Sequence, residues 1–256
     1  MGYTPLAWAT GNGHEEVVKL LLGRGDINPN KPDEEGKTPL FLAAEKGHEG
    51  VVRALLERND INPDKPNGDG KAPLSRAARN GHLEVVKILL GRGDVNPDEP
   101  DKEGQTPLCR AAEEGHEGVV RILLGRNDIN PDKPNGYSET PLSRAARNGH
   151  LGVVKILLER DDVDPDKPDE EGQTPLCRAA EEGHEGVVRA LLGRNDINPD
   201  KPNGYSETPF SRAARNGHLG VVKILLGRDD VNPDKPDRFG RSPLWLAAWG
   251  AHEGVL

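Results

Sequence analysis

Residues 101–134 read DKEGQTPLCRAAEEGHEGVVRILLGRNDINPDKP, and this stretch decides the fold because the rest of the chain repeats it. Thr106 and Pro107 mark a helix start, since threonine can cap a helix and proline is tolerated in the first turn. Apolar residues at positions 108, 111 and 112 then follow at helical spacing. Gly115 can adopt positive φ, so it is expected to end this helix.

A second apolar stripe, at positions 119, 120, 123 and 124, predicts a second helix. Residues 130–134 read Asn-Pro-Asp-Lys-Pro and cannot continue it, because they contain two prolines and several turn formers. The predicted unit is therefore a helix, a tight turn, a second helix and an extended loop.

The unit recurs every 34 residues along the whole chain. Its Thr-Pro-Leu triplet, or a variant, begins at Thr4, Thr38, Ala72, Thr106, Thr140, Thr174, Thr208 and Ser242. Such a period predicts stacked repeats, here an all-α single domain over residues 1–256. The expected repeats are approximately 1–32, 33–66, 67–100, 101–134, 135–168, 169–202, 203–236 and a truncated 237–256.

Composition restricts the class of partner. The formal net charge of −9 argues against nucleic acid and against anionic membrane surfaces, since both attract basic proteins. No apolar run approaches the roughly 20 residues of a membrane span. Cys109 and Cys177 lie two repeats apart, too far for a disulfide, so reduced thiols and a cytoplasmic location are expected.

Histidine occurs once per repeat, always at the same position after the first helix. Two histidines in different layers are too far apart to share a metal ion, which needs bonds of about 2.0–2.1 Å. A backbone hydrogen bond at the inter-helix turn is the expected role. We predict no metal and no cofactor.

The pattern G-x-T-P-L-x-x-A-A-x-x-G-H-x-x-V-V-x-x-L-L resembles the ankyrin repeat over the whole chain. Two features depart from that family: its usual histidine after Thr-Pro-Leu is missing, and each repeat has 34 residues instead of 33. The resemblance implies an ankyrin-repeat solenoid, with loops projecting sideways from a concave layer of inner helices. It also implies a non-catalytic module that binds a protein partner on that layer and on the loop tips.

Alternate repeats are more alike than neighbours, which adds a 68-residue period. Residues 105–172 and 173–240 differ at only six of 68 positions. Such high-identity arrays are similar to those of fungal NOD-like receptors, and this similarity implies the ligand-sensing part of a larger cytoplasmic receptor. A passive scaffold or a designed consensus array without a natural ligand is the main alternative, and an enzyme is a remote one.

Charged residues on the first helix of each repeat alternate between the two classes and form the first candidate site. One interpretation is a patterned surface for a charged partner. The other is an internal network, in which glutamate rows face arginine rows of adjacent repeats. The candidates are Arg76, Arg79, Arg110, Glu113, Glu114, Arg144, Arg147, Arg178, Glu181, Glu182, Arg212 and Arg215.

Aromatic residues supply the remaining candidates. Tyr137 and Tyr205 occupy predicted loop tips, either as binding anchors or packed on a neighbouring loop. Ser138 replaces the usual glycine of that tip, so the turn is expected to move to Asn135-Gly136. Trp245 and Trp249 lie in the last repeat, and because neither end carries a polar cap, we expect a piece of a longer protein that can associate end to end.

Overall fold

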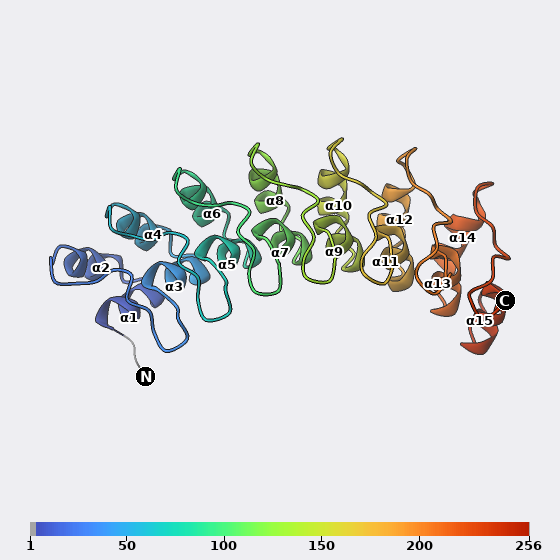
Figure 1. Ribbon diagram of the computed structural model, residues 1–256, viewed down its shortest axis with the longest axis horizontal. Coiled ribbons are helices and arrows are strands. Elements are labelled where there is room, and N and C mark those ends of the chain that lie inside the picture. Colours follow the sequence, from blue (N-terminus) through green and yellow to red (C-terminus); the bar gives the residue numbers. More distant parts are fainter. Residues whose placement is uncertain (1–3, 256) are drawn as a thin grey trace. The chain divides into compact units, whose positions relative to one another are not determined.

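A computed structural model describes residues 4–255 of the chain and shows fifteen helices and no strand over that range (Figure 1). The described residues fall into two compact units, divided between Asn130 and Pro131. The expected all-α fold of helix–turn–helix repeats is confirmed. The first unit contains α1 (Pro5–Gly11), α2 (Glu15–Leu22), α3 (Pro39–Lys46), α4 (Glu49–Leu56), α5 (Pro73–Arg79), α6 (Leu83–Leu90), α7 (Pro107–Glu113) and α8 (Glu117–Leu124). The second contains α9 (Pro141–Arg147), α10 (Leu151–Leu158), α11 (Pro175–Glu182), α12 (Glu185–Leu191), α13 (Pro209–Arg215), α14 (Leu219–Leu226) and α15 (Pro243–Trp249).

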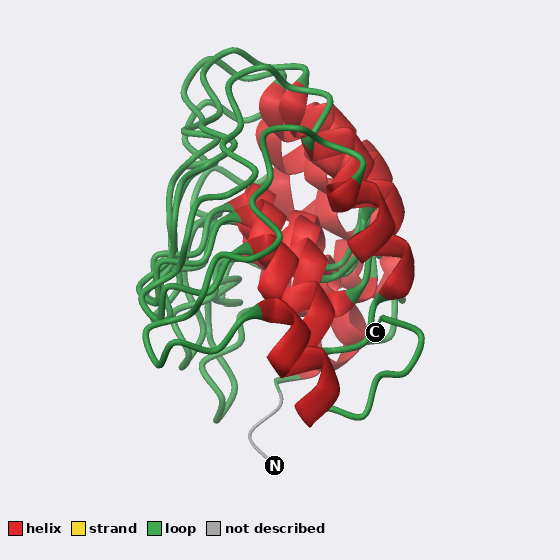
Figure 2. Ribbon diagram, turned by 90° about the vertical axis from the view of Figure 1, so that its right-hand side faces the viewer, coloured by secondary structure: helices red, strands yellow, loops and turns green. Residues whose placement is uncertain are grey.

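Each unit consists of two helical layers. Within each unit, the odd-numbered helices, called the inner helices, contact one another in sequence, as do the even-numbered, outer helices. The two helices of each complete repeat also pack together. In each unit the long loops leave the helices on one side (Figure 2). The predicted apolar stripes supply the core: Leu108, Ala111 and Val120, for example, are completely buried. No described helix is long and apolar enough to cross a membrane.

The Thr-Pro pair starts each inner helix as the sequence predicts. The Thr106 hydroxyl accepts a hydrogen bond from the Cys109 N–H at 3.1 Å, and Pro107 occupies the first helical position. Ala72 cannot make this bond and leaves α5 without a side-chain cap. Gly115 has φ of 79°, which confirms its predicted place after α7.

Within each unit, the histidine of one repeat lies against a glycine of the repeat before it. Nε2 of His82 is 3.0 Å from the Glu45 carbonyl, and His218 makes the equivalent contact with Glu181 at 2.7 Å. Since a carbonyl only accepts, this nitrogen must carry the proton. A Cβ added to Gly47 would lie 2.6 Å from Nδ1 of His82, closer than real Cβ atoms approach. The expected backbone role of histidine is thus confirmed, and it connects adjacent repeats.

The outer helices are connected by an Arg-x-Asp motif. Arg92 bonds both carboxylate oxygens of Asp94, while its third nitrogen donates to the Leu56 carbonyl at the end of the preceding outer helix. The hydrogen bonds from Arg92 hold the pKa of Asp94 below its usual value. The same three-way contact recurs at Arg58, Arg126, Arg194 and Arg228. Each such arginine therefore satisfies a carbonyl that would otherwise lack an intrahelical partner.

A half-buried aspartate of the extended loop, Asp166, destabilises the stack. One Asp166 oxygen accepts the Asn198 N–H at 2.7 Å, while the other is buried without a hydrogen bond. Burial raises the pKa of Asp166, and the Asn198 bond lowers it only in part. Asn30 fills the equivalent position in the first repeat, where its amide also donates to the Asp60 carbonyl.

We expect Asp166→Asn to stabilise the protein by about 0.5–1 kcal/mol at neutral pH, because the amide can make both contacts. Because the pKa of Asp166 is higher in the folded than in the unfolded state, its ionised carboxylate lowers the free energy of unfolding at any pH above the folded-state pKa. Once the carboxyl is protonated in both states, it no longer lowers the stability. The gain should therefore vanish as the pH falls to about 4, the ordinary aspartate pKa. Urea unfolding at both pH values measures the effect. A loss of stability at neutral pH would contradict this account.

Candidate functional site

An aspartate or asparagine organises the loop before each inner helix. Oδ1 of Asn135 accepts the N–H groups of Tyr137 and Glu139, both at 2.9 Å. Oδ1 of Asp169 accepts those of Glu171 and Gln173 in the same way. Asp101 and Asn203 repeat the arrangement. This side chain therefore replaces a backbone acceptor inside a tight turn.

The same turn holds one buried carboxylate in each of these four repeats, in one of two places. In one class the turn residue itself carries the charge, and Asp101 bonds Arg110 at 2.6 Å while Asp169 bonds Arg178 at 2.6 Å. In the other class the turn residue is asparagine and the charge lies four residues later. There Glu139 bonds Arg144 at 3.0 Å and Glu207 bonds Arg212 at 2.9 Å.

In the second class the buried carboxylate bonds two arginines of the following helix. Glu139 pairs with Arg147 at 3.4 Å as well as with Arg144, and Glu207 pairs with Arg215 at 2.8 Å. The second class needs this bridging carboxylate, because its helices carry a second arginine where α7 and α11 carry Glu113 and Glu181. The 68-residue period is thus a change of charge position inside the protein as well as on its surface.

The expectation that the helix arginine is exposed is wrong for Arg110. Its side chain is only 6% accessible and contacts Asp101, Glu103 and Glu113. Arg76, Arg144, Arg178 and Arg212 are partly buried. Burial of a guanidinium requires a charged partner, and the loop carboxylates that supply one were not among the candidates chosen from the sequence. Their signal was the alternation of Asp-x-x-x-Gln with Asn-x-x-x-Glu before Thr106, Thr140, Thr174 and Thr208.

Bonds between adjacent repeats use the remaining candidates, as the internal-network interpretation expects. Arg79 bonds Glu114 at 3.1 Å, Arg147 lies 4.0 Å from Glu182, and Arg212 bonds Glu181. Arg76 instead contacts Glu45, a partner missed in the sequence. Arg147, Arg215, Glu114 and Glu182 keep about 36–45% of their side chains accessible. These four remain available to a partner at the edge of the network.

The tyrosines are exposed, as the loop-tip prediction requires: Tyr137 is 62% and Tyr205 42% accessible. The expected shift of the turn to Asn135-Gly136 is wrong. Ser138 takes φ of 59° and Ser206 takes 60°, so serine adopts the left-handed conformation that glycine holds in the other tips. The two turn bonds from Asn135 fix the backbone and impose this conformation on the serine.

Neighbouring tips are joined by one backbone hydrogen bond. The Glu170 N–H donates to the Tyr137 carbonyl at 3.3 Å, and the Arg238 N–H donates to the Tyr205 carbonyl at 3.0 Å. At the second of these tips the Arg238 guanidinium lies 4.4 Å from the centre of the Tyr205 ring. Tyr205 therefore does contact its neighbouring loop, as the alternative interpretation expects.

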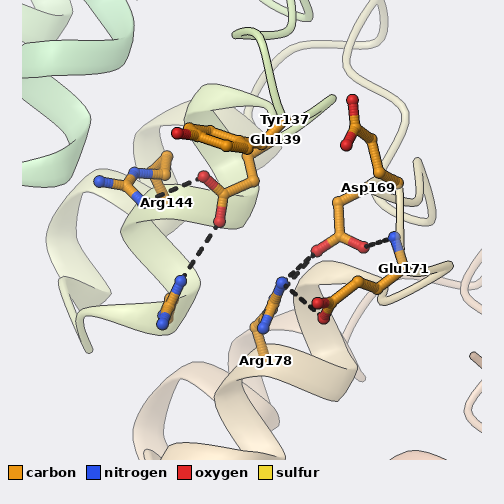
Figure 3. A pocket seen from close by; sticks show the side chains of 8 residues that line it. Tyr137, Glu139, Arg144, Asp169, Glu171 and Arg178 are labelled. Atoms are coloured by element: carbon orange, nitrogen blue, oxygen red, sulfur yellow. Dashed lines mark hydrogen bonds and ion pairs between the residues drawn. The ribbon is translucent and has the colours of Figure 1, made fainter. Parts of the chain in front are cut away.

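A shallow polar groove of about 320 Å³ runs between Tyr137 and the next repeat. Figure 3 shows Tyr137 above Glu139 and Arg144 on one side, with Asp169, Glu171 and Arg178 on the other. Arg178 bonds Asp169 and lies 3.5 Å from Glu171. The groove thus offers an aromatic face and several charges that are partly neutralised.

The aromatic residues of α15 form a separate surface. Trp245 and Trp249 stack at 6.3 Å and are 47% and 66% exposed, next to Leu244 at 59%. Arg241 lies over the Trp245 ring. The first repeat also exposes apolar side chains, namely Trp8 and Leu20.

The described residues contain no group of three or more histidine, cysteine and acidic side chains placed to hold a metal ion. Cys109 and Cys177 are both buried, and neither forms a disulfide. Burial raises the pKa of Cys177 to about 12, so its thiol is a poor nucleophile.

Comparison with known families gives matches over nearly the whole chain. The model described as Ankyrin repeats (3 copies) matches residues 1–67, 59–135 and 127–203. The model described as Ankyrin repeat matches residues 205–238. A search of curated proteins finds no match.

Replacement of the bridging carboxylate tests its role in the fold. Glu139→Gln leaves Arg144 and Arg147 without this partner, and we expect a loss of about 3 kcal/mol in the free energy of unfolding. The exposed change Glu170→Gln should alter it by less than about 0.5 kcal/mol. Adding Asn135→Asp to Glu139→Gln moves the charge to the place that it occupies in alternate repeats, and should recover most of the loss. A double variant no more stable than Glu139→Gln would disprove the equivalence of the two arrangements.

Proposed function

Because the chain belongs to the ankyrin-repeat family, we propose that it is a non-catalytic module that binds a protein partner through its inner helices and loop tips. One observation carries the proposal: large aromatic side chains at three of the four loop tips of the second unit are exposed, with Tyr137 at 62%, Tyr205 at 42% and Phe239 at 63%. They stand beside partly accessible charges. Exposed aromatic and arginine side chains of this kind are common anchors of protein interfaces.

The edge charges support specificity more than affinity. Arg215 is bonded by the buried Glu207. The pairs Arg79–Glu114 and Arg147–Glu182 are partly exposed, and exposed ion pairs contribute only about 0–1 kcal/mol each. A charged partner can exchange these bonds for its own at little cost. Binding energy is therefore expected to come from the aromatic tips, and partner choice from the charges.

A pull-down with the whole chain tests the proposal. Variants of its loop tips are then compared for their capture of the retained partner. Tyr137→Ala with Tyr205→Ala should reduce capture at least tenfold, since buried interface aromatics can contribute about 2 kcal/mol or more each. Replacing exposed Glu15 and Glu16 of α2 with glutamine is the matched control and should leave capture unchanged. If the tyrosine variant and the control lost capture equally, or if neither lost it, the loop tips would not be the binding surface.

We further propose that these repeats are the ligand-sensing region of a larger cytoplasmic receptor. The near-identity of alternate repeats and the two buried cysteines, which form no disulfide, support this context. A nucleotide-binding domain encoded upstream in the same gene would support the receptor. The many bonds between the helix charges favour the alternative, a passive or designed array. Such an array would retain no partner in the pull-down.

Self-association is a second proposed interaction of the chain. The exposed side chains of Trp249, Leu244, Trp8 and Leu20 support contacts between copies. Light scattering at high concentration provides the measurement, and a strict monomer would contradict this proposal.

A further inference from the structure

Two loop tips of the second unit share the same backbone and differ in what covers their tyrosine. The N–H of residue 170 donates to the Tyr137 carbonyl, just as the N–H of residue 238 donates to the Tyr205 carbonyl. Asn135 and Asn203 hold both turns with the same pair of bonds. The side chains at 170 and 238 therefore leave equivalent points, each beside a tyrosine.

The occupant of that position reverses its charge. Arg238 places its guanidinium 4.4 Å from the Tyr205 ring centre, while the equivalent residue beside Tyr137 is Glu170. The next position changes from Phe239 to Glu171. These are two of the six differences between residues 105–172 and 173–240, so a third of the divergence lies beside this ring.

The exchange leaves the Tyr137 ring without a cation over its face among the residues that the structure describes. Its 62% exposure against 42% for Tyr205 agrees with the missing cover. The face of an aromatic ring is negative, and the exposed carboxylate of Glu170 adds to that charge. Glu171 is only partly neutralised, since its nearest guanidinium nitrogen, on Arg178, is 3.5 Å away.

We propose that Tyr137, Glu170 and Glu171 form a binding site for an arginine side chain of the protein partner. The guanidinium would occupy the place that Arg238 takes in the copy, over the ring and between the carboxylates. Arginine suits the site better than lysine, because its planar group can stack on the ring while its edge bonds a carboxylate. At Tyr205 the protein's own Arg238 occupies the equivalent place, so that this ring takes no arginine from the partner.

This inference deepens the proposed function by naming the chemistry of one anchor of the partner, and it can be tested without the partner. The probe is the peptide acetyl-Gly-Gly-Arg-Gly-Gly-amide, titrated into the folded chain while the tyrosine ring signals are followed by NMR. Tyr137→Phe assigns the signal. We expect the Tyr137 ring to shift saturably, and the neutral citrulline peptide to bind at least about fivefold more weakly, as a cation–π contact combined with an ion pair predicts.

Exchanging the side chains between the two tips gives the decisive comparison. Glu170→Arg should supply an internal guanidinium to Tyr137 and weaken peptide binding there by about fivefold or more. Arg238→Glu with Phe239→Glu should open the other tip, so that the Tyr205 ring responds to the peptide. Both changes are at exposed positions, and an unchanged melting temperature confirms that the variants fold.

Equal shifts with arginine and citrulline peptides, or a Glu170→Arg variant that binds as well as the original, would overturn the inference. The pull-down separates its failure from failure of the proposed function. A partner retained equally by the original and by Glu170→Arg would leave the interaction module standing and remove the arginine site.

Discussion

Stacking of these repeats depends on a glycine that leaves room for an imidazole. The glycine at the inter-helix turn adopts positive φ, and the histidine of the next repeat lies where its Cβ would be. The imidazole then reaches a carbonyl at the end of the previous inner helix, as His116 does at Arg79. One contact thus sets both the end of a helix and the distance to its neighbour, and it explains why glycine and histidine recur together.

Once that distance is fixed, the polar groups of each repeat have defined partners. The Arg-x-Asp pairs bond the ends of the outer helices, and the loop carboxylates bond the arginines of the inner ones. The buried carboxylate can occupy either of two positions four residues apart, because both positions reach the arginine at the equivalent place in the helix, Arg110 in one class and Arg144 in the other. A two-repeat period is therefore compatible with one unchanged backbone.

The fold could be predicted closely from the sequence, since capping threonines, helical stripes and paired prolines all act within a single repeat. The contacts that each loop makes with its own turn and helix were harder to predict. Arginine is usually exposed, and Arg110 is buried because it donates a hydrogen bond to Asp101 of the preceding loop. Ser138 was expected to displace its turn, yet Asn135 holds the backbone and the serine accepts positive φ. Both errors arise where a side chain of the loop outweighs local propensity.

The proposed binding surface consists of what this network leaves accessible, namely the aromatic tips and the partly accessible charges beside them. Hydroxyl-radical footprinting of the chain with a retained partner tests that claim most directly, because it reports the accessibility of each side chain. The account predicts protection at Tyr137, Tyr205 and residues 170–171, with the outer helices unchanged. Protection confined to the outer helices α10, α12 and α14 would contradict it.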